Sequence, residues 1–270
     1  MIVGIDIGGT TTKIVGLGPN KEKICALVKA SDPVASAAGA IGKFLSVAGK
    51  KLSDISRLAV TGVGSSCIAE EILGIRVEHV EEFQAVGLGG LELSGAEKAL
   101  VVSVGTGTAI VHAEGRKARH LGGSGVGGGT ILGLGKALAG ITDFDTLALA
   151  ASRGNVKVVD LTIGDISSKA VGSLPSDATA SNFGKMADKP SSDDLAAGIV
   201  NMVFQTVGML AIMAAKAEKD TTIVVVGNTM KIPAARDVLD RLYPIYGVRF
   251  IIPELAQYAT ALGAALFLSE

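Results

Sequence analysis

The chain contains no tryptophan, and aromatic residues account for only 4% of its 270 residues. Its core must therefore be filled mainly by Val, Ile, Leu and Ala, a composition that suits helices packed on sheets. Cysteine is also scarce, because Cys25 and Cys67 are the only two. Two isolated cysteines cannot form a disulfide framework or a complete metal site within one chain, so we expect a protein of the reducing cytoplasm.

An excess of charge of one sign is absent as well. The 25 basic and 26 acidic residues give a net charge of -1 and form no long block of like charge. Such a chain attracts neither a nucleic-acid backbone nor an anionic membrane. Residues 1–16 lack both a basic region and a cleavage site of small residues, so we predict no signal peptide.

One long uncharged stretch, residues 195–215, is long enough to span a bilayer. Within it Asn201 and Gln205 lie one helical turn apart, and much of the stretch is Ala or Gly rather than Leu or Phe. We therefore predict a buried helix, either between two lobes or at a dimer interface, and no membrane partner.

The chain does contain three apolar segments that each run into a turn rich in glycine. Residues 1–15 predict a hairpin around a turn at residues 8–11. The segment that starts near residue 98 repeats this pattern around residues 105–108, and a third turn follows a strand at residues 227–229. This internal repeat, with helical patterns between the strands, predicts two α/β lobes at residues 1–93 and 94–270.

The remaining elements are predicted from periodicity and from their caps. Residues 155–190 are polar and interrupted by Pro175 and Pro190, so we expect loops and short elements there. Ser191 or Ser192 is expected to cap a long helix. The predicted helices are residues 34–49, 66–73, 192–218 and 256–269, and residues 57–62 are predicted to form a buried strand.

The first glycine turn has the chemistry of a phosphate site. Asp6 stands directly before backbone that glycine allows to approach a ligand closely. Asp6 would face Mg²⁺, directly or through water, while Lys13 would neutralise phosphate charge. Residues 127–129 form a second turn of phosphate size before an apolar helical pattern. An ordinary hairpin and a flexible surface loop are the simpler alternatives for these two segments.

Other nucleotide-binding motifs are missing. The sequence has no GxxxxGK[ST] motif, and GSGVGG at residues 123–128 follows no clear strand of a dinucleotide-binding unit. The order of the three turns instead fits a two-lobed ATPase. In that arrangement one turn of each lobe holds the phosphates and the third lies beside the adenosine.

Seven segments together make the chain resemble the type II pantothenate kinases of staphylococci and eukaryotes along essentially its whole length. They are GIDIGGTTTKI (residues 4–14), EFQAVGLG (82–89), VGTGT (104–108), GGSGVGGGTILGLG (122–135), TASNFGK (179–185), VVGNT (225–229) and ATALGAAL (259–266). The resemblance implies a two-lobed actin/hexokinase-like (ribonuclease H-like) ATPase fold with duplicated βββαβα-type domains. It also implies a homodimer that transfers phosphate from Mg-ATP to the primary hydroxyl of pantothenate, the first step of coenzyme A synthesis.

By this resemblance Glu82 is the catalytic base. A carboxylate suits that role because a primary alcohol must be oriented and must lose its proton as the phosphoryl group moves. A solvated pair formed by Glu81 and Glu82 at a strand end is the alternative. The implied nucleotide-binding residues are Gly8, Gly9, Thr10, Thr11, Lys13, Thr106, Gly127, Gly128, Gly129, Gly227 and Asn228, and the implied acceptor-binding residues are Thr106, Thr108, Ala109, Arg119 and His120.

Two acceptor positions depart from the family. His120 stands where relatives carry an arginine, with Arg119 adjacent, and Ala109 stands where relatives carry a serine. The acceptor therefore stays open between pantothenate and a related molecule such as pantetheine or a sugar. An ATPase activator of a 2-hydroxyacyl-CoA dehydratase is an alternative of another class, but Cys25 and Cys67 lie outside the second-lobe segments where that family places its cluster ligands.

Overall fold

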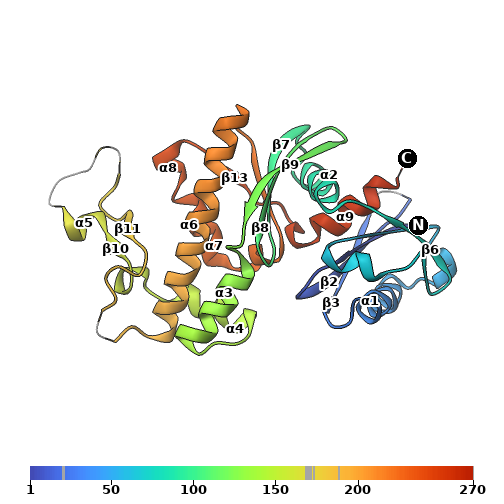
Figure 1. The fold of residues 1–270 in the computed structure, drawn as a ribbon, viewed down its shortest axis with the longest axis horizontal. Helices are drawn as coiled ribbons and strands as arrows, with labels where there is room; N and C mark the ends of the chain where they lie inside the picture. Colours follow the sequence, from blue (N-terminus) through green and yellow to red (C-terminus); the bar gives the residue numbers. More distant parts are fainter. Residues whose placement is uncertain (20–21, 168–171, 173, 188, 270) are drawn as a thin grey trace.

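The computed structural model describes residues 1–19, 22–167, 172, 174–187 and 189–269. Two mixed sheets form the centres of two lobes (Figure 1). The strand order is β3-β2-β1-β4-β6-β5 in the first sheet and β13-β12-β7-β8-β9 in the second.

The first lobe is built by residues that alternate between the two faces of its sheet. Val3, Ile5 and Ile7 point to the face covered by α1, which Asp32 caps at its N-terminus. Asp6 lies between Ile5 and Ile7 near the end of β1, so its side chain points to the other face of the sheet. The elements are β1 (Ile2–Ile7), β2 (Thr11–Leu17), β3 (Lys23–Lys29), α1 (Pro33–Ala48), β4 (Arg57–Thr61), β5 (Glu71–Ile72) and β6 (Ile75–His79).

The second lobe repeats this plan with more helices. Its sheet is covered on one face by α2 and on the other by the long helix α6 (Figure 1). Its elements are α2 (Glu82–Ser94), β7 (Lys98–Val104), β8 (Thr108–Glu114), β9 (Lys117–Ser124), α3 (Gly128–Leu134), α4 (Phe144–Arg153), β10 (Leu161–Thr162), α5 (Ile163–Ile166), β11 (Thr179–Ser181), α6 (Ser192–Glu218), β12 (Ile223–Val226), α7 (Pro233–Asp240), α8 (Tyr243–Tyr246), β13 (Phe250–Ile251) and α9 (Ala259–Phe267).

The two sheets share one topology, as the internal repeat predicts. In the first, β1, β2 and β3 form an antiparallel meander, and β4 and then β6 add parallel to β1. In the second, β7, β8 and β9 form the meander, and β12 and then β13 add parallel to β7. The turns β1–β2 and β7–β8 therefore occupy equivalent positions in the two lobes.

Helix α9 returns from the second lobe to the first. It packs on β1, β2 and β4 and lies against α2 (Figure 1). A Cβ atom on Gly263 would lie 1.8 Å from the carbonyl oxygen of Ala85, so this helix crossing depends on glycine. The division into lobes at residues 93 and 94 remains a prediction, because α9 joins the first sheet and α2 (Glu82–Ser94) covers the second.

Most predicted elements are confirmed, and one is wrong. Both hairpins, α1, β4, β12 and α6 form, with Ser191 as the N-cap of α6. The helix predicted at residues 66–73 does not form. A short 3₁₀ turn at Val63–Cys67 is followed by the β5–β6 hairpin, whose two turn residues Leu73 and Gly74 both have positive φ.

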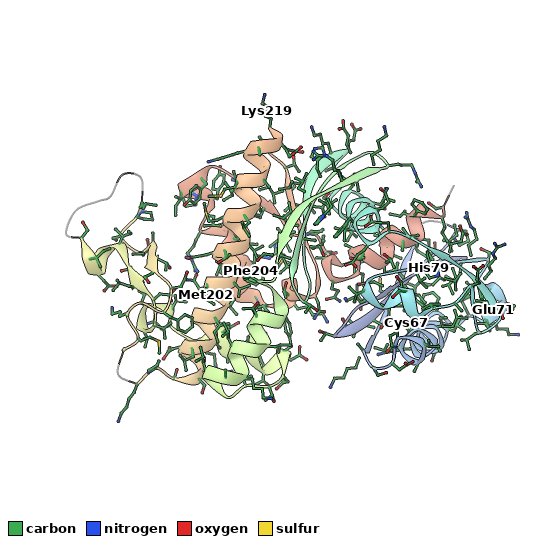
Figure 2. All side chains as sticks on the ribbon, viewed as in Figure 1. Cys67, Glu71, His79, Met202, Phe204 and Lys219 are labelled. Atoms are coloured by element: carbon green, nitrogen blue, oxygen red, sulfur yellow. The ribbon has the colours of Figure 1, made fainter. Side chains whose placement is uncertain are left out.

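Helix α6 is long and apolar enough to cross a membrane, and it is the single such helix in the described part of the chain. Within the protein, however, 72% of its most apolar segment is buried. Figure 2 shows Phe204 and Met202 on this helix, and Phe204 is fully buried in the core of the second lobe. Its apolar character is therefore explained by packing between the second sheet and the surrounding helices.

Candidate functional site

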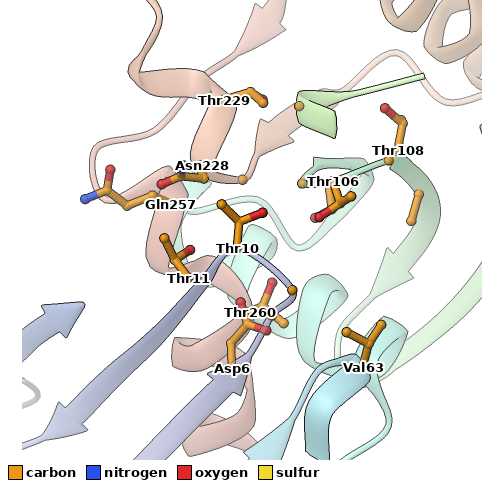
Figure 3. A pocket seen from close by; sticks show the side chains of 18 of the residues that line it. Asp6, Thr10, Thr11, Val63, Thr106, Thr108, Asn228, Thr229, Gln257 and Thr260 are labelled. Atoms are coloured by element: carbon orange, nitrogen blue, oxygen red, sulfur yellow. The ribbon is translucent and has the colours of Figure 1, made fainter. Parts of the chain in front are cut away.

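A cavity of about 280 Å³ lies where the two lobes meet. The three glycine turns predicted from the sequence all line it, and Figure 3 shows threonine side chains of all three turns around it. Its charged lining residues are Asp6, Lys13 and Glu82. Segments that are far apart in the chain thus line one cavity.

Asp6 and Lys13 form an ion pair at the inner end of this cavity. They are direct partners in the antiparallel register of β1 and β2, so their side chains leave the sheet side by side. Lys13 Nζ lies 3.2 Å from Asp6 Oδ2, and both side chains are 11% exposed. The pair is therefore held in place before any ligand arrives.

Glu82 opens helix α2 and lines the same cavity. Its neighbour Glu81 is the N-cap of α2 and accepts a hydrogen bond from the Gln84 amide at 2.8 Å, so the two glutamates have different surroundings. Burial raises the pKa of Glu82, and the charge of Asp6 raises it further. A carboxylate with a raised pKa is suited to accept a proton near neutral pH.

The third turn is fixed within the second lobe and presents an open acceptor. The Thr229 hydroxyl donates to Val104 O at 2.8 Å, and the Gly227 amide donates to Ala256 O at 2.9 Å. Asn228 Oδ1 is buried and has no hydrogen-bond partner among the described residues. A donor group on a bound nucleotide would satisfy it. The predicted nucleotide-binding residues that line the cavity are Gly8, Gly9, Thr10, Thr11, Lys13, Thr106, Gly128, Gly227 and Asn228.

The glycines at residues 127–129 have a packing role that the sequence does not reveal. The amides of Gly128 and Gly129 donate to Gly105 O and Thr106 O at 2.8 Å, and the Gly127 amide donates to Thr130 Oγ1. Their amides are thus engaged by the protein, and only Gly128 of the three lines the cavity. These glycines let α3 approach the second turn closely.

The predicted acceptor-binding residues divide into two groups. Thr106, Thr108 and Ala109 line the cavity, whereas Arg119 and His120 do not. Arg119 donates to Glu218 at the end of α6 at 2.6 Å. His120 stacks on Phe83 of α2, with ring centroids 3.8 Å apart and planes 3° apart. The two neighbours therefore lie on opposite faces of the second sheet.

Several lining residues were not predicted from the sequence. Ser103 occupies the place in β7 that Asp6 occupies in β1, so an alignment of the two repeats would have found it. Leu132 and Phe144 add an apolar wall from α3 and α4. Gln257 and Thr260 come from the region where α9 begins, and no local motif marks them. The full set is Val63, Ser103, Ser124, Leu132, Phe144, Gln257 and Thr260.

Comparison with known proteins decides the family. A family model described as Fumble matches residues 98–239. The type II pantothenate kinase of Staphylococcus aureus (strain USA300) is 33% identical over 276 aligned positions, which cover 98% of both chains. The chain belongs to the type II pantothenate kinase family. As a member of this family it is a kinase, an enzyme that transfers a phosphoryl group.

Solved structures agree on the fold. The activator of the 2-hydroxyisocaproyl-CoA dehydratase from Clostridium difficile, with bound ADPNP, aligns with a TM-score of 0.72 at 18% identity, covering 98% of this kinase and 93% of that chain. A ROK family glucokinase from Streptomyces griseus, in complex with glucose and AMPPNP, aligns with a TM-score of 0.62 at 12% identity, covering 98% of both chains. The predicted two-lobed actin/hexokinase-like ATPase fold is confirmed.

The two cysteines lie away from the cavity in the first lobe, where Figure 2 labels Cys67. Both are free, and Cys25 is on β3. Burial raises the pKa of the Cys25 thiol to about 11, which makes it a poor ligand or nucleophile. Neither cysteine lines the cavity.

A second cavity of about 660 Å³ lies beside α6, and Thr179 of the TASNFGK segment lines it. Asp160 is fully buried there. One of its oxygens accepts from the Phe183 amide at 2.8 Å, and the other accepts from the side chains of Asn182 at 3.1 Å and Asn201 at 2.7 Å. Arg241 in turn donates to Asn201. This network joins the loop region to α6.

Replacement of Asp160 by alanine should destabilise the protein by about 3 kcal/mol, because one buried and two half-buried donors lose their acceptor. Urea denaturation of the variant would measure this loss. Asp177 is an exposed acid at the same cavity, and its replacement by alanine should change stability by no more than about 0.5 kcal/mol. Equal effects of the two changes would contradict the buried network.

Proposed function

We propose that this protein transfers the γ-phosphoryl group of ATP to the primary hydroxyl of pantothenate or a close relative, the first step of coenzyme A synthesis. One observation carries the proposal: Glu82 and the Asp6–Lys13 pair line one cavity together with the three glycine turns. Family membership supports the choice of substrate.

In this proposal the two lobes supply different parts of the donor site. The turns at residues 8–11 and 105–108 hold the phosphates through backbone amides and threonine hydroxyls. Lys13 neutralises phosphate charge, and Asn228 with the apolar side chains of Leu132 and Phe144 binds the nucleoside. Preorganised contacts of this kind are the main source of rate enhancement in phosphoryl transfer.

Asp6 is the residue that would hold Mg²⁺. The described residues contain no group of three or more His, Cys, Asp or Glu side chains that could bind a metal without help. That fits Mg²⁺, which prefers one or two carboxylates with phosphate oxygens and water as the other ligands. Bound Mg²⁺ supplies positive charge to the transferring phosphate.

Glu82 is proposed to orient the acceptor hydroxyl and to accept its proton as the bond to phosphorus forms. Its place at the start of α2, beside Ser103 and Ala109, sets the acceptor end of the cavity. In-line transfer would require the hydroxyl to approach the phosphate from the side away from the nucleoside.

The assembly and location are also proposed from family membership: a cytoplasmic homodimer, with lobes at residues 1–93 and 94–270. The measured mass in solution would test the dimer.

Asp6→Asn should lower kcat by about 10²- to 10³-fold, because a neutral amide cannot replace the charge beside the phosphates and leaves Lys13 unpaired. The measurement is ADP release from Mg-ATP with pantothenate as acceptor. Asp177→Asn, at an exposed acid outside the cavity, is the control and should behave as wild type. A near-normal kcat for Asp6→Asn would overturn the assignment of this residue.

A further inference from the structure

A threonine on the neighbouring strand stands beside Asp6. Thr61 ends β4, which pairs in parallel with β1, and the two residues are direct partners in that register. Gly4 and Ala59, two residues earlier in the same strands, face α9. Because side chains alternate along a strand, Asp6 and Thr61 project from this same face. Asp6 therefore has Lys13 of β2 on one side and Thr61 on the other.

The hydroxyl of this threonine has no partner. Thr61 is 0% exposed, and its Oγ1 atom makes no hydrogen bond to any of the residues that the structure describes. An unpaired buried hydroxyl destabilises a fold, and native proteins keep few such groups. Packing alone therefore does not account for a threonine at this position.

The repeat between the two lobes provides an internal comparison. Strand β12 pairs with β7 as β4 pairs with β1, and Val226 takes the place of Thr61 in that register. Val226 is also 0% exposed. Each strand then passes through a glycine of positive φ into a 3₁₀ turn, at Gly62 in the first lobe and at Gly227 in the second. The fold thus accepts valine at this place, and the hydroxyl occurs in the lobe where the neighbour is Asp6.

The two carboxylate oxygens of Asp6 face different neighbours. Oδ2 lies 3.2 Å from Lys13 Nζ. Oδ1 is turned toward the end of β4, because a Cβ atom on Gly62 would lie 2.6 Å from it. One oxygen is therefore held by the lysine, and the other lies on the side of the strand that carries the unpartnered hydroxyl.

Lys13 has two tasks in the proposed function. It pairs with Asp6 in this structure, and it neutralises phosphate charge when ATP is bound. An ammonium group that turns toward the phosphates leaves Asp6 with a weaker hold on its orientation. A carboxylate that serves a cation depends on such outer hydrogen bonds to stay aligned. The hydroxyl of Thr61 is a donor that can rotate to supply one.

We propose, resting on the function proposed above, that Thr61 is the positioning residue for Asp6 in the nucleotide complex. Its hydroxyl donates to Oδ1 and keeps the carboxylate aligned for Mg-ATP while Lys13 contacts the phosphates. In the free enzyme the ion pair with Lys13 holds Asp6 instead, which explains why the hydroxyl is unpartnered there.

Thr61→Val tests the proposal, because valine keeps the shape and removes only the hydroxyl. Calorimetric ATP binding over a series of Mg²⁺ concentrations, without acceptor, should show that half-maximal binding needs about tenfold more Mg²⁺. This is the effect of losing about one hydrogen bond to a charged group. We expect kcat with pantothenate to fall about tenfold as well. The melting temperature without ligands should stay the same or rise, since a buried unpaired group is gone.

Thr61→Ser separates positioning from packing. Serine keeps the hydroxyl and loses a buried methyl group, so the melting temperature should fall while the Mg²⁺ dependence stays within about twofold of wild type. Thr12→Val is the matched control. Thr12 is also 0% exposed with an unpartnered hydroxyl, but it pairs with Ile7 on the face that α1 covers. Its replacement should leave the Mg²⁺ dependence unchanged.

Three results would overturn the role of Thr61 and leave the proposed function intact. They are a wild-type Mg²⁺ dependence in Thr61→Val, an equal loss in Thr61→Ser, and a lowered melting temperature of Thr61→Val that accompanies its weaker binding. A wild-type protein that binds ATP equally with and without Mg²⁺ and phosphorylates no acceptor would overturn the proposed function, and the role of Thr61 with it.

Discussion

Glu82→Gln is expected to lower kcat by about 10²- to 10⁴-fold while leaving the affinity for ATP nearly unchanged. A glutamine keeps the shape of the side chain and can still accept a hydrogen bond, but it cannot take a proton from the acceptor hydroxyl. Steady-state rates and calorimetric ATP binding on the same preparation measure the two quantities. Glu81→Gln is the matched control, because Glu81 caps α2 through the Gln84 amide and does not line the cavity.

The pKa of Glu82 gives this prediction a second, independent readout. A base must be ionised, so wild-type kcat should fall as the pH drops through the raised pKa of Glu82. The same shift means that ionised Glu82 destabilises the fold, since burial disfavours its charge. Glu82→Gln should therefore raise the melting temperature above that pKa, with a gain that disappears at pH values below the pKa of an unfolded glutamate. A parallel loss of ATP binding and kcat, without this gain, would indicate misfolding instead.

Gly263→Ala should destabilise the protein by about 4 kcal/mol or more. The added Cβ atom would lie 1.8 Å from Ala85 O and 2.8 Å from the Gly89 amide nitrogen, and both atoms belong to the backbone of α2. Backbone cannot rotate away as a flexible side chain can, so α2 and α9 would have to separate. Thermal or urea unfolding would measure the loss.

Gly42 provides the matched control for this substitution. It lies on an exposed position of α1, and a Cβ atom there would have no neighbour within 4 Å. Gly42→Ala should therefore stabilise the protein by up to about 1 kcal/mol, through the better helix propensity of alanine. If Gly263→Ala were tolerated as well as Gly42→Ala, the close crossing of α2 and α9 would be disproved.

The sequence predicted the parts of the site that depend on local patterns. Asp6 and the three turns follow from apolar strands that end in glycine, and the repeat of that pattern correctly predicted two equivalent sheets. The long helix α6 followed from its uncharged length and its serine cap. Each of these signals lies within one short segment of the chain.

The parts that could not be predicted depend on contacts between distant segments. Helix α2 was not predicted because Gly87, Gly89 and Gly90 lower its helix propensity, yet all three are needed where it touches β-strands or α9. The bulge at Leu121 sets which of Arg119 and His120 faces α2, and no sequence period shows it.

The return of α9 to the first sheet has a consequence for synthesis on the ribosome. Gly4 and Ala59 face α9, so that side of the first sheet stays uncovered until α9 itself has been made. The amino-terminal lobe therefore cannot complete its core as an independent unit while the rest is being made. Chaperones that shield apolar strands would meet this surface until then, and the emergence of α9 would set the moment at which both lobes become stable together.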